Sequence, residues 1–285
     1  ANELALRMAY TCTKQQDIIA LKSGYHGNTN ACIDISSYKF EGKGGKQKPV
    51  NTHLIPLPDS FRGKYRGETS GSSYAHHAHE ITDQLKLKGK SPAAFIHESI
   101  VSCGGQIMLP HGFLEQVYNT VKGAGGICIA DEVQTGLGRV GTHWWAFEQH
   151  NVVPDIVTIG KPLGNGHPVA AVVCKRQVAD AFANGMEFFN TFGGNPVSCA
   201  IGNEVLRVIR QEGLMENAKV TGNYIIQELK EIQQQYTIIG DVRGSGLFLG
   251  FEFVTPDLTP LGEQTAYFSN RMKEATEWYQ KLARN

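Results

Sequence analysis

An aspartate and a lysine each end a short apolar run in the middle of the chain. Asp131 ends the run that begins at Ile127, and Lys161 ends the run that begins after Asp155. Short apolar runs bounded by Gly or Pro are typical of buried parallel strands. Ligands of open α/β sheets bind at the carboxyl edge of the strands, so we expect both side chains at such an edge.

A lysine amine and a carboxylate at one sheet edge suit the chemistry of pyridoxal phosphate. This cofactor needs a lysine that forms a Schiff base and an acidic group that faces its pyridine nitrogen. A carboxylate favours the protonated nitrogen, which makes the ring an electron sink. A free lysine is a poor nucleophile at neutral pH, because its pKa is about 10.4, and burial can lower that value. The bland alternatives are a solvated lysine and a capping carboxylate; the apolar runs and the Gly and Pro residues around Lys161 favour chemistry.

A glycine-rich segment offers a competing interpretation as a dinucleotide-binding dehydrogenase. Gly136–Gly141 matches G-x-G-x-x-G. However, Glu132–Thr135 separates the first glycine from the strand that ends at Asp131, and the bulky Trp144 and Trp145 follow the last glycine. A helix packed on a dinucleotide would not start this way, so we reject the dehydrogenase.

Two polar clusters are candidates for further sites. His76, His77 and His79 with Glu80 could hold a metal, but no second cluster completes a tetrahedral set, and a solvated helix start is favoured. The lysines of the segment 42–48 lack the spacing of a phosphate-binding loop. They could grip an anionic substrate group, although a mobile solvated loop is the better interpretation.

The composition describes a globular protein with no global preference for a charged partner. The 27 basic and 27 acidic residues cancel, which disfavours nucleic acid and anionic membranes as partners. No apolar run approaches the roughly 20 residues that span a bilayer. The six cysteines form no C-x-x-C pair, which predicts a reducing, cytoplasmic environment.

The order of patterns predicts an α/β fold with a mainly parallel sheet. Expected strands at 17–21, 93–97, 127–131, 155–160 and 169–174 alternate with expected helices at 1–9, 77–88, 113–122 and 176–183. Residues 38–72 are expected to form a long loop region. The pattern is helical over 196–235 with a break near Gly213, and then shows strands within 238–254. We therefore expect a large domain at 1–212 and a partial α+β small domain at 213–285.

Three ordered segments resemble one enzyme family. They are Ile129–Arg139 (Ile-Ala-Asp-Glu-Val-Gln-Thr-Gly-Leu-Gly-Arg), Gly160-Lys161, and Thr191–Pro196 (Thr-Phe-Gly-Gly-Asn-Pro). Together they resemble the class III aminotransferases, and the similarity extends to about Met272. The resemblance implies pyridoxal 5'-phosphate as cofactor and the fold-type-I architecture, a three-layer α/β/α large domain with a small C-terminal domain.

The resemblance assigns residues around the cofactor ring. Lys161 matches the Schiff-base lysine, and Asp131 matches the partner of the pyridine nitrogen. Gln134 matches the side chain that hydrogen-bonds the ring hydroxyl, and Val133 matches the one that packs on a ring face.

Further matches lie away from these motifs. In Gly-Tyr-His-Gly, Tyr25 matches the aromatic residue that stacks on the opposite ring face, and we assign its neighbour His26 to the cofactor site as well. Glu98 matches a glutamate near the substrate. Thr191 matches a threonine that holds the cofactor phosphate from the neighbouring subunit, which implies a homodimer.

One segment distinguishes branches of the family. Most members carry Glu-Pro-hydrophobic-Gln-Gly-Glu where this chain has Glu98-Ser-Ile-Val-Ser-Cys103. This resembles the phospho-lyases, which act on phosphoethanolamine or 5-phosphohydroxylysine. The implied reaction is proton removal by Lys161 from the carbon that bears the substrate amine, followed by loss of phosphate from the adjacent carbon. The alternative is a transaminase that moves an amino group from an ω-amine or amino acid to a keto acid.

Three departures from the family pattern keep a third possibility open. The Ser-Gly-Ser phosphate loop expected just before Ala1 is absent, the C-terminal Arg-x-x-Pro-Pro segment of many relatives is missing, and residues 273–285 do not continue the family pattern. The opening helix also has no capping residue before it. We therefore interpret the chain as part of a longer one and expect weakened cofactor binding. An inactive dimerisation or scaffold remnant remains an alternative.

Overall fold

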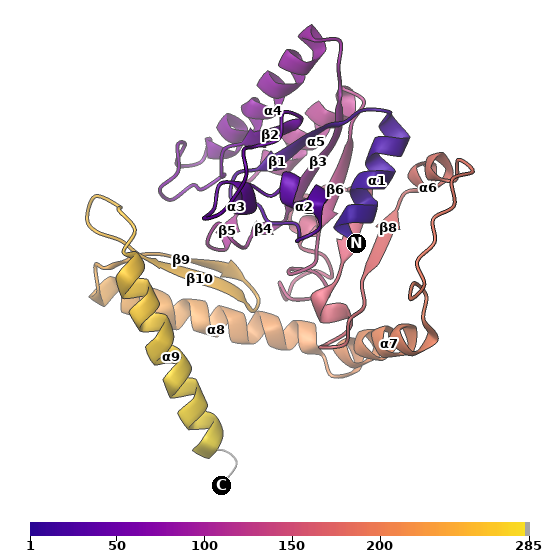
Figure 1. The fold of residues 1–285 in the computed structure, drawn as a ribbon. Helices are drawn as coiled ribbons and strands as arrows, with labels where there is room; N and C mark the ends of the chain where they lie inside the picture. The colour runs from indigo at the N-terminus through magenta and orange to yellow at the C-terminus, as the bar shows by residue number, and fades with distance from the viewer. Residues whose placement is uncertain (283–285) are drawn as a thin grey trace.

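A central sheet organises the larger part of the molecule. The computed structural model describes residues 1–282, and within them six strands run in the order β2-β1-β3-β6-β7-β8 (Figure 1). Neighbouring strands are parallel, except that β8 is antiparallel to β7. The strands are β1 Asp17–Leu21, β2 Thr52–Ile55, β3 Pro92–Glu98, β6 Ile127–Asp131, β7 Ile156–Ile159 and β8 Ala171–Cys174. The predicted mainly parallel sheet is confirmed.

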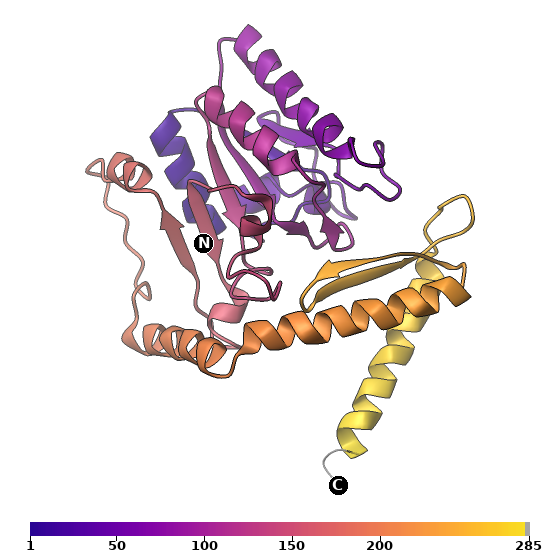
Figure 2. The same cartoon turned by 180° about the vertical axis from the view of Figure 1, so that it is seen from behind.

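Helices cover both faces of this sheet, which makes three layers. On one face lie α1 Asn2–Thr13, α2 Asn30–Asp34 and α6 Arg176–Phe182; on the other lie α4 Ser70–Leu87 and α5 Phe113–Gly123 (Figures 1 and 2). Alternate residues of β1 show the division. Ile18 packs in the core with α1, whereas Ile19 packs in the core with α4 and α5. Because both faces are buried, the strands have continuous apolar sequences.

The C-terminal part has its own small core. It follows α7 Pro196–Gln211 and consists of α8 Leu214–Gln235, the antiparallel hairpin of β9 Ile239–Ser245 and β10 Phe248–Phe253, and α9 Gly262–Leu282. Ile239, Val242 and Phe253 are buried together against α8. Gly213 separates α7 from α8 with a left-handed φ of 61°, so the break predicted there is confirmed.

The region predicted as a long loop, residues 38–72, contains more structure than expected. It holds β2, most of the short helix α3 Ser37–Phe40, and the start of α4, which begins at Ser70 rather than His77. Within the first turn of α4, a Cβ on Gly71 would lie 2.1 Å from the carbonyl oxygen of His111. Only glycine permits this close approach of α4 to the chain before α5.

Candidate active site

The carboxyl edge of the sheet gathers the predicted residues. Glu98 ends β3 and Asp131 ends β6, and the two are direct register partners. Lys161 follows the end of β7 after one glycine and begins the short 3-10 helix η2 Lys161–Leu163. Tyr25 and His26 lie in the segment that leaves the carboxyl end of β1.

A cavity of about 130 Å³ lies at this edge. It is lined by Asn2, Tyr25, His26, Gly27, Glu98, Ile100, Asp131, Val133, Gln134, Thr135 and Lys161. A wider, open cavity of about 520 Å³ adjoins it and shares Asn2, His26, Gly27, Val133 and Lys161. The predicted site residues thus lie together, with one exception. Thr191 is exposed and lies between α6 and α7, outside the lining of both cavities.

Asp131 is a buried carboxylate held by donors from several parts of the chain, among them the Thr158 hydroxyl of β7, which donates to Oδ1 at 3.5 Å. Its Oδ2 accepts from Asn2 Nδ2 at 2.7 Å and from His26 Nδ1 at 2.8 Å, and its Oδ1 accepts from the Val133 N–H at 3.1 Å. Burial would raise the pKa of Asp131, but the hydrogen bond and charge of His26, with the bonds from Val133 and Asn2, outweigh it and lower the pKa. The group is therefore ionised at neutral pH.

His26 and Asn2 each present an unpaired polar atom beside this carboxylate. An ionised carboxylate only accepts, so His26 Nδ1 carries the proton. Its Nε2 is buried and has no hydrogen-bond partner among the described residues, and the same is true of Asn2 Oδ1. Buried polar atoms are normally paired, so two unpaired ones that line one cavity indicate a ligand site.

Asn2 is a residue of this cavity that the sequence pattern did not predict. It is the first residue of α1, and its Nδ2 donates to the His26 carbonyl at 2.8 Å as well as to Asp131. The available signal was a polar residue beside the apolar positions Ala5 and Ala9 of a helix that packs on the sheet.

Glu98 forms a polar chain along the cavity. It is buried, which raises its pKa. Its oxygens accept from the Tyr25 N–H at 3.2 Å and from the hydroxyl of Ser102, and Ser102 in turn accepts from Gln134 Nε2 at 2.6 Å. Ser102 was not singled out from the sequence, because a serine in a turn gives no specific signal.

Lys161 has an unusual backbone. Its φ of 23° lies in the left-handed region that residues other than glycine rarely adopt. Such strain persists where the surroundings enforce it and is frequent at functional sites. The side chain is exposed, so other residues of this chain do not bury its amine.

The glycines of the rejected dinucleotide motif have a packing role. A Cβ at Gly138 would lie 2.3 Å from Met215, and one at Gly141 would lie 2.6 Å from the Lys219 nitrogen. Met215 and Lys219 belong to α8, so the motif lets the C-terminal part approach the loop that follows β6.

The histidine and lysine clusters lie on exposed or partly exposed surface. Within residues 1–282, no group of three or more His, Cys, Asp and Glu side chains could hold a metal ion. His77 instead pairs with Glu80 at 2.7 Å. Lys43, Lys46 and Lys48 are exposed, and Lys48 binds the Thr52 carbonyl at 2.7 Å.

Comparison with known sequences settles the family. The sequence profile described as Aminotransferase class-III matches residues 1–275. The chain belongs to the class III aminotransferase family. A Drosophila melanogaster protein named alanine–glyoxylate aminotransferase 2-like is 50% identical over 96% of the chain and 57% of its own length. A Caenorhabditis elegans ethanolamine-phosphate phospho-lyase homolog 1 is 38% identical over 89% of the chain and 57% of its own length.

A solved structure agrees with this class III assignment. An Arthrobacter phospholyase in complex with phosphoethanolamine has a TM-score of 0.84 and 36% identity, and the match covers 92% of this chain and 62% of that one. The chain spans just over half the length of the curated relatives it matches. The expected three-layer fold-type-I architecture is confirmed.

Pyridoxal 5'-phosphate is the cofactor of this class III family, and solved relatives hold it. The residues at the cavity fit it. An ionised carboxylate, a lysine at the end of the neighbouring strand and unpaired buried polar atoms line the same space.

No helix in residues 1–282 combines the length and apolar character that crossing a membrane requires.

Proposed function

We propose that this chain belongs to a pyridoxal-phosphate enzyme that eliminates phosphate from a phosphorylated amine, phosphoethanolamine or 5-phosphohydroxylysine. The observation that carries the proposal is the shared cavity of Asp131 and Lys161. The choice of phosphate elimination is supported by the Glu98–Cys103 segment and by two relatives whose names include phospho-lyase or phospholyase.

Asp131 and its neighbours would bind the cofactor ring. The ionised carboxylate of Asp131 would hold a proton on the pyridine nitrogen, and Asn2 and His26 would orient that carboxylate. Val133 and Tyr25 would pack on the two faces of the ring, and Gln134 would bind the ring hydroxyl. When bound, pyridoxal phosphate supplies an electron sink for charge that develops at the substrate carbon next to nitrogen.

Lys161 would be the base. Its Nζ would take the proton from the carbon that bears the substrate nitrogen. The bond between the adjacent carbon and the phosphate oxygen would then break, and phosphate would leave with the electron pair. Water would release the remaining fragment as an aldehyde and ammonia. Glu98, near the substrate, would be held by Ser102 and the Tyr25 N–H.

Transamination is the second candidate, supported by the name of the Drosophila relative. It begins with the same proton removal but needs a keto acid as acceptor. The two are separated by incubating the purified protein with cofactor and phosphoethanolamine without any keto acid. We expect phosphate release; release that strictly requires a keto acid would overturn the elimination.

The alternative of an inactive scaffold remnant is tested by the absorption spectrum of the protein. With added cofactor we expect a band near the visible edge that disappears in Lys161→Ala and persists in Lys175→Ala, a lysine bound to Asp155 outside both cavities. A colourless wild-type protein would favour the remnant.

We further propose a homodimer in which Thr191 reaches the cofactor phosphate of the partner subunit. Its support is the exposure of apolar residues around Thr191, with Phe189 77% and Phe192 80% exposed. Such exposed patches mark interfaces.

We retain 1–212 and 213–285 as the two domains, supported by the separate core at Ile239, Val242 and Phe253. The six free cysteines support the cytoplasm as the location.

A further inference from the structure

Arg243 of β9 contacts the active-site half of the molecule rather than solvent. Its side chain is 12% exposed. Nε and Nη2 both donate to the Gly105 carbonyl, at 3.0 and 2.7 Å, and Nη1 pairs with Asp241 at 2.6 Å. Gly105 lies in the turn 102–106 that joins the short strands β4 Ile100–Val101 and β5 Ile107–Met108.

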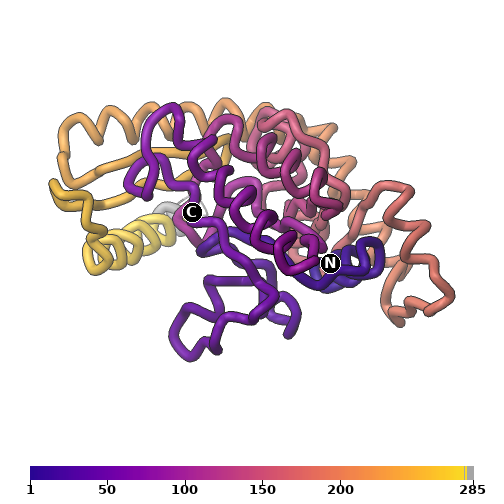
Figure 3. The backbone as a smooth tube through the Cα atoms, turned by 90° about the horizontal axis from the view of Figure 1, so that it is seen from above, coloured from indigo at the N-terminus to yellow at the C-terminus, as the bar shows by residue number. Residues whose placement is uncertain are grey.

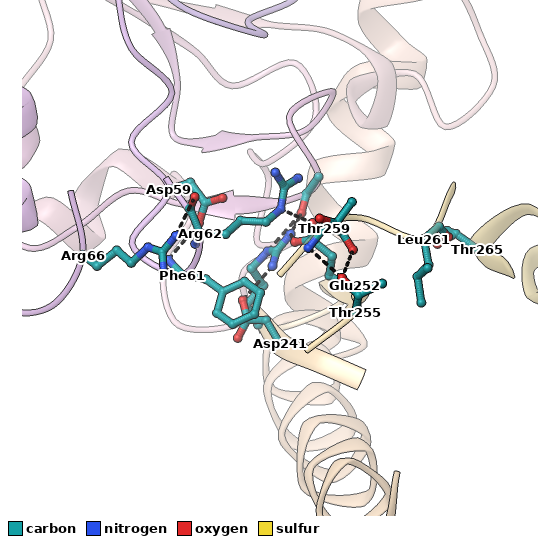
Figure 4. A network of polar contacts seen from close by, with 12 residues as sticks. Asp59, Phe61, Arg62, Arg66, Asp241, Glu252, Thr255, Thr259, Leu261 and Thr265 are labelled. Carbon is teal, nitrogen blue, oxygen red and sulfur yellow. Dashed lines mark hydrogen bonds and ion pairs between the residues drawn. The ribbon is translucent and has the colours of Figure 1, made fainter. Parts of the chain in front are cut away.

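Glu252 of β10 extends this contact into a network. Its Oε2 pairs with Arg243 Nη2 at 3.1 Å, and its Oε1 pairs with Arg62 Nε (Figure 4). Arg62 belongs to the segment before α4, where Asp59 accepts the backbone N–H groups of Phe61 and Arg62. The C-terminal hairpin is thus fixed to the large sheet domain at two points. Because Glu252 and Arg243 are each 12% exposed, salt screens their pairing less than it screens surface pairs.

The turn 102–106 needs such support. Gly105 has a φ of 107° and Gln106 a φ of 54°, both in the left-handed region, which is strained for glutamine. The N–H groups of Gly105 and Gln106 both bond to the Ser102 carbonyl, at 3.0 and 3.3 Å. A shift of the Gly105 carbonyl would therefore move Ser102.

Ser102 connects this turn to the site. Its hydroxyl donates to Glu98 and accepts from Gln134 Nε2 at 2.6 Å. Both partners line the cavity of Asp131 and Lys161. Direct contacts therefore lead from Arg243 through the turn to two groups that face the proposed cofactor and substrate.

We propose that Arg243 is a positioning residue for the active site: it fixes the Gly105 carbonyl and, through the turn, keeps Ser102 between Glu98 and Gln134. The proposal rests on the proposed function for the roles of Glu98 and Gln134. The guanidinium is required, because two bonds to one carbonyl and pairing with two carboxylates need donors in a planar fork. A lysine at this position could make only some of these contacts.

The test is a double-mutant cycle with Ser102→Ala. Arg243→Ala, Ser102→Ala, the double variant and the control Arg207→Ala, which removes an exposed pair with Glu204, are titrated with pyridoxal phosphate. We expect each of Arg243→Ala and Ser102→Ala to raise the cofactor Kd about tenfold and to shift the absorption maximum of the bound cofactor, because Gln134 loses its support. The double variant should resemble Ser102→Ala. Arg243→Lys should be intermediate, and the control unchanged.

A second readout uses no cofactor. Amide hydrogen exchange at Gly105 and Gln106 should accelerate in Arg243→Ala and to a smaller degree in Arg243→Lys, with little change at Arg207→Ala. The proposal is overturned if the double variant raises the cofactor Kd about a hundredfold, as two independent effects would. It is also overturned if amide exchange in the turn is unchanged in Arg243→Ala. If Arg243→Ala does not fold, the same measurements on Arg243→Lys and Glu252→Gln decide. If wild-type protein binds no cofactor, the proposed function fails, and the exchange result alone decides whether Arg243 holds the turn.

Discussion

At the scale of single residues, the state of Asp131 depends on neighbours that are distant in sequence. Its donors come from α1, from the segment after β1, from β7 and from its own strand end. Burial alone would favour a neutral carboxyl group, so these donors are what keep the charge that a pyridine nitrogen needs.

Asn2→Ala tests this dependence. The variant removes a hydrogen bond to a charged group, which is worth about 1.5–3 kcal/mol. We expect the pKa of Asp131 to rise and the cofactor Kd to increase about tenfold, as measured by absorbance titration. Asn223→Ala, at an exposed asparagine of α8 outside both cavities, is the control and should bind normally. Unchanged affinity in Asn2→Ala would show that His26, Val133 and Thr158 suffice to hold Asp131.

The sequence predicted the residues that line the cavity better than it predicted the residues that support them. Asp131 and Lys161 follow apolar runs, and the runs alone place them at one sheet edge. Asn2 and Ser102 act through contacts with residues far along the chain, at sequence distances of 129 for Asn2–Asp131 and 32 for Gln134–Ser102. Local patterns do not encode such pairs.

At the scale of elements, Glu132 fastens the end of β6. It is fully buried, and burial raises its pKa. Its Oε1 accepts from the Ser99 hydroxyl and the Phe147 N–H, and its Oε2 accepts from the Thr135 hydroxyl and the Ala146 N–H. The carboxylate thus ties β6 to the 3-10 helix η1 Ala146–His150.

Glu132→Gln should destabilise the fold. A Gln amide nitrogen cannot accept, so in either orientation one backbone N–H of η1 loses its partner. An unpaired buried donor costs about 1–3 kcal/mol. Urea unfolding measures the loss, and Glu228→Gln, on the exposed face of α8, should leave the free energy of unfolding unchanged. Equal stability of Glu132→Gln and wild type would contradict this account.

His97 in β3 makes stability depend on pH. It is fully buried and accepts from or donates to the Tyr118 hydroxyl at 2.8 Å, and burial lowers its pKa to about 3. An unfolded histidine has a pKa of about 6.5, so between these values the unfolded chain binds more protons. The free energy of unfolding therefore falls as pH decreases below about 6.5, by about 2 kcal/mol at pH 5.

His97→Gln should remove that contribution. Glutamine does not titrate, so the difference in unfolding free energy between pH 8 and pH 5 should shrink by about 2 kcal/mol. The lost stacking on Phe95 acts at both pH values and cancels in the difference. His76→Gln, on an exposed face of α4, should not alter the difference. A difference that stays the same in His97→Gln would refute the assignment.

Element boundaries were predicted where local pattern decides and missed where tertiary contacts decide. The strands at 17–21 and 127–131 and the break at Gly213 follow from apolar runs and glycine. The edge strand β2 spans only four residues in a segment rich in Gly, Lys and Pro, so its pattern is weak. The antiparallel direction of β8 has no local signature, because direction depends on the path of the chain through space.

At the scale of the whole molecule, the backbone of the C-terminal part packs closely against the part that contains the large sheet. A Cβ at Gly222 of α8 would lie 2.0 Å from the Gly246 carbonyl oxygen, and one at Gly246 would lie 2.4 Å from the Arg139 carbonyl oxygen. The hairpin turn is therefore pressed between α8 and the loop after β6. Figure 3 shows this part at one end of the molecule and the segment around 183–195 at the other.

The segment 186–197 is where we expect a second subunit to bind. It exposes Met186, Phe189, Phe192 and Val197, between 64% and 80% of each side chain. A single chain gains nothing from ordering these residues in water, whereas a symmetric partner would bury them. Thr191 lies among them, so association and cofactor binding should be linked.

Phe192→Asp tests this link. Phe192 is 80% exposed, so an aspartate there should leave the folded subunit intact, but burying its charge at an interface should prevent association. We expect sedimentation to change from dimer to monomer and the cofactor Kd to rise at the same protein concentration. Val50→Asp, at a valine 93% exposed in another loop, should change neither. Thr191→Val should keep the dimer and weaken only cofactor binding, since it removes the hydroxyl that we propose to bind the cofactor phosphate. If the wild-type protein is a monomer that binds cofactor tightly, then Thr191 does not bind the cofactor phosphate and the exposed phenylalanines do not form a subunit interface.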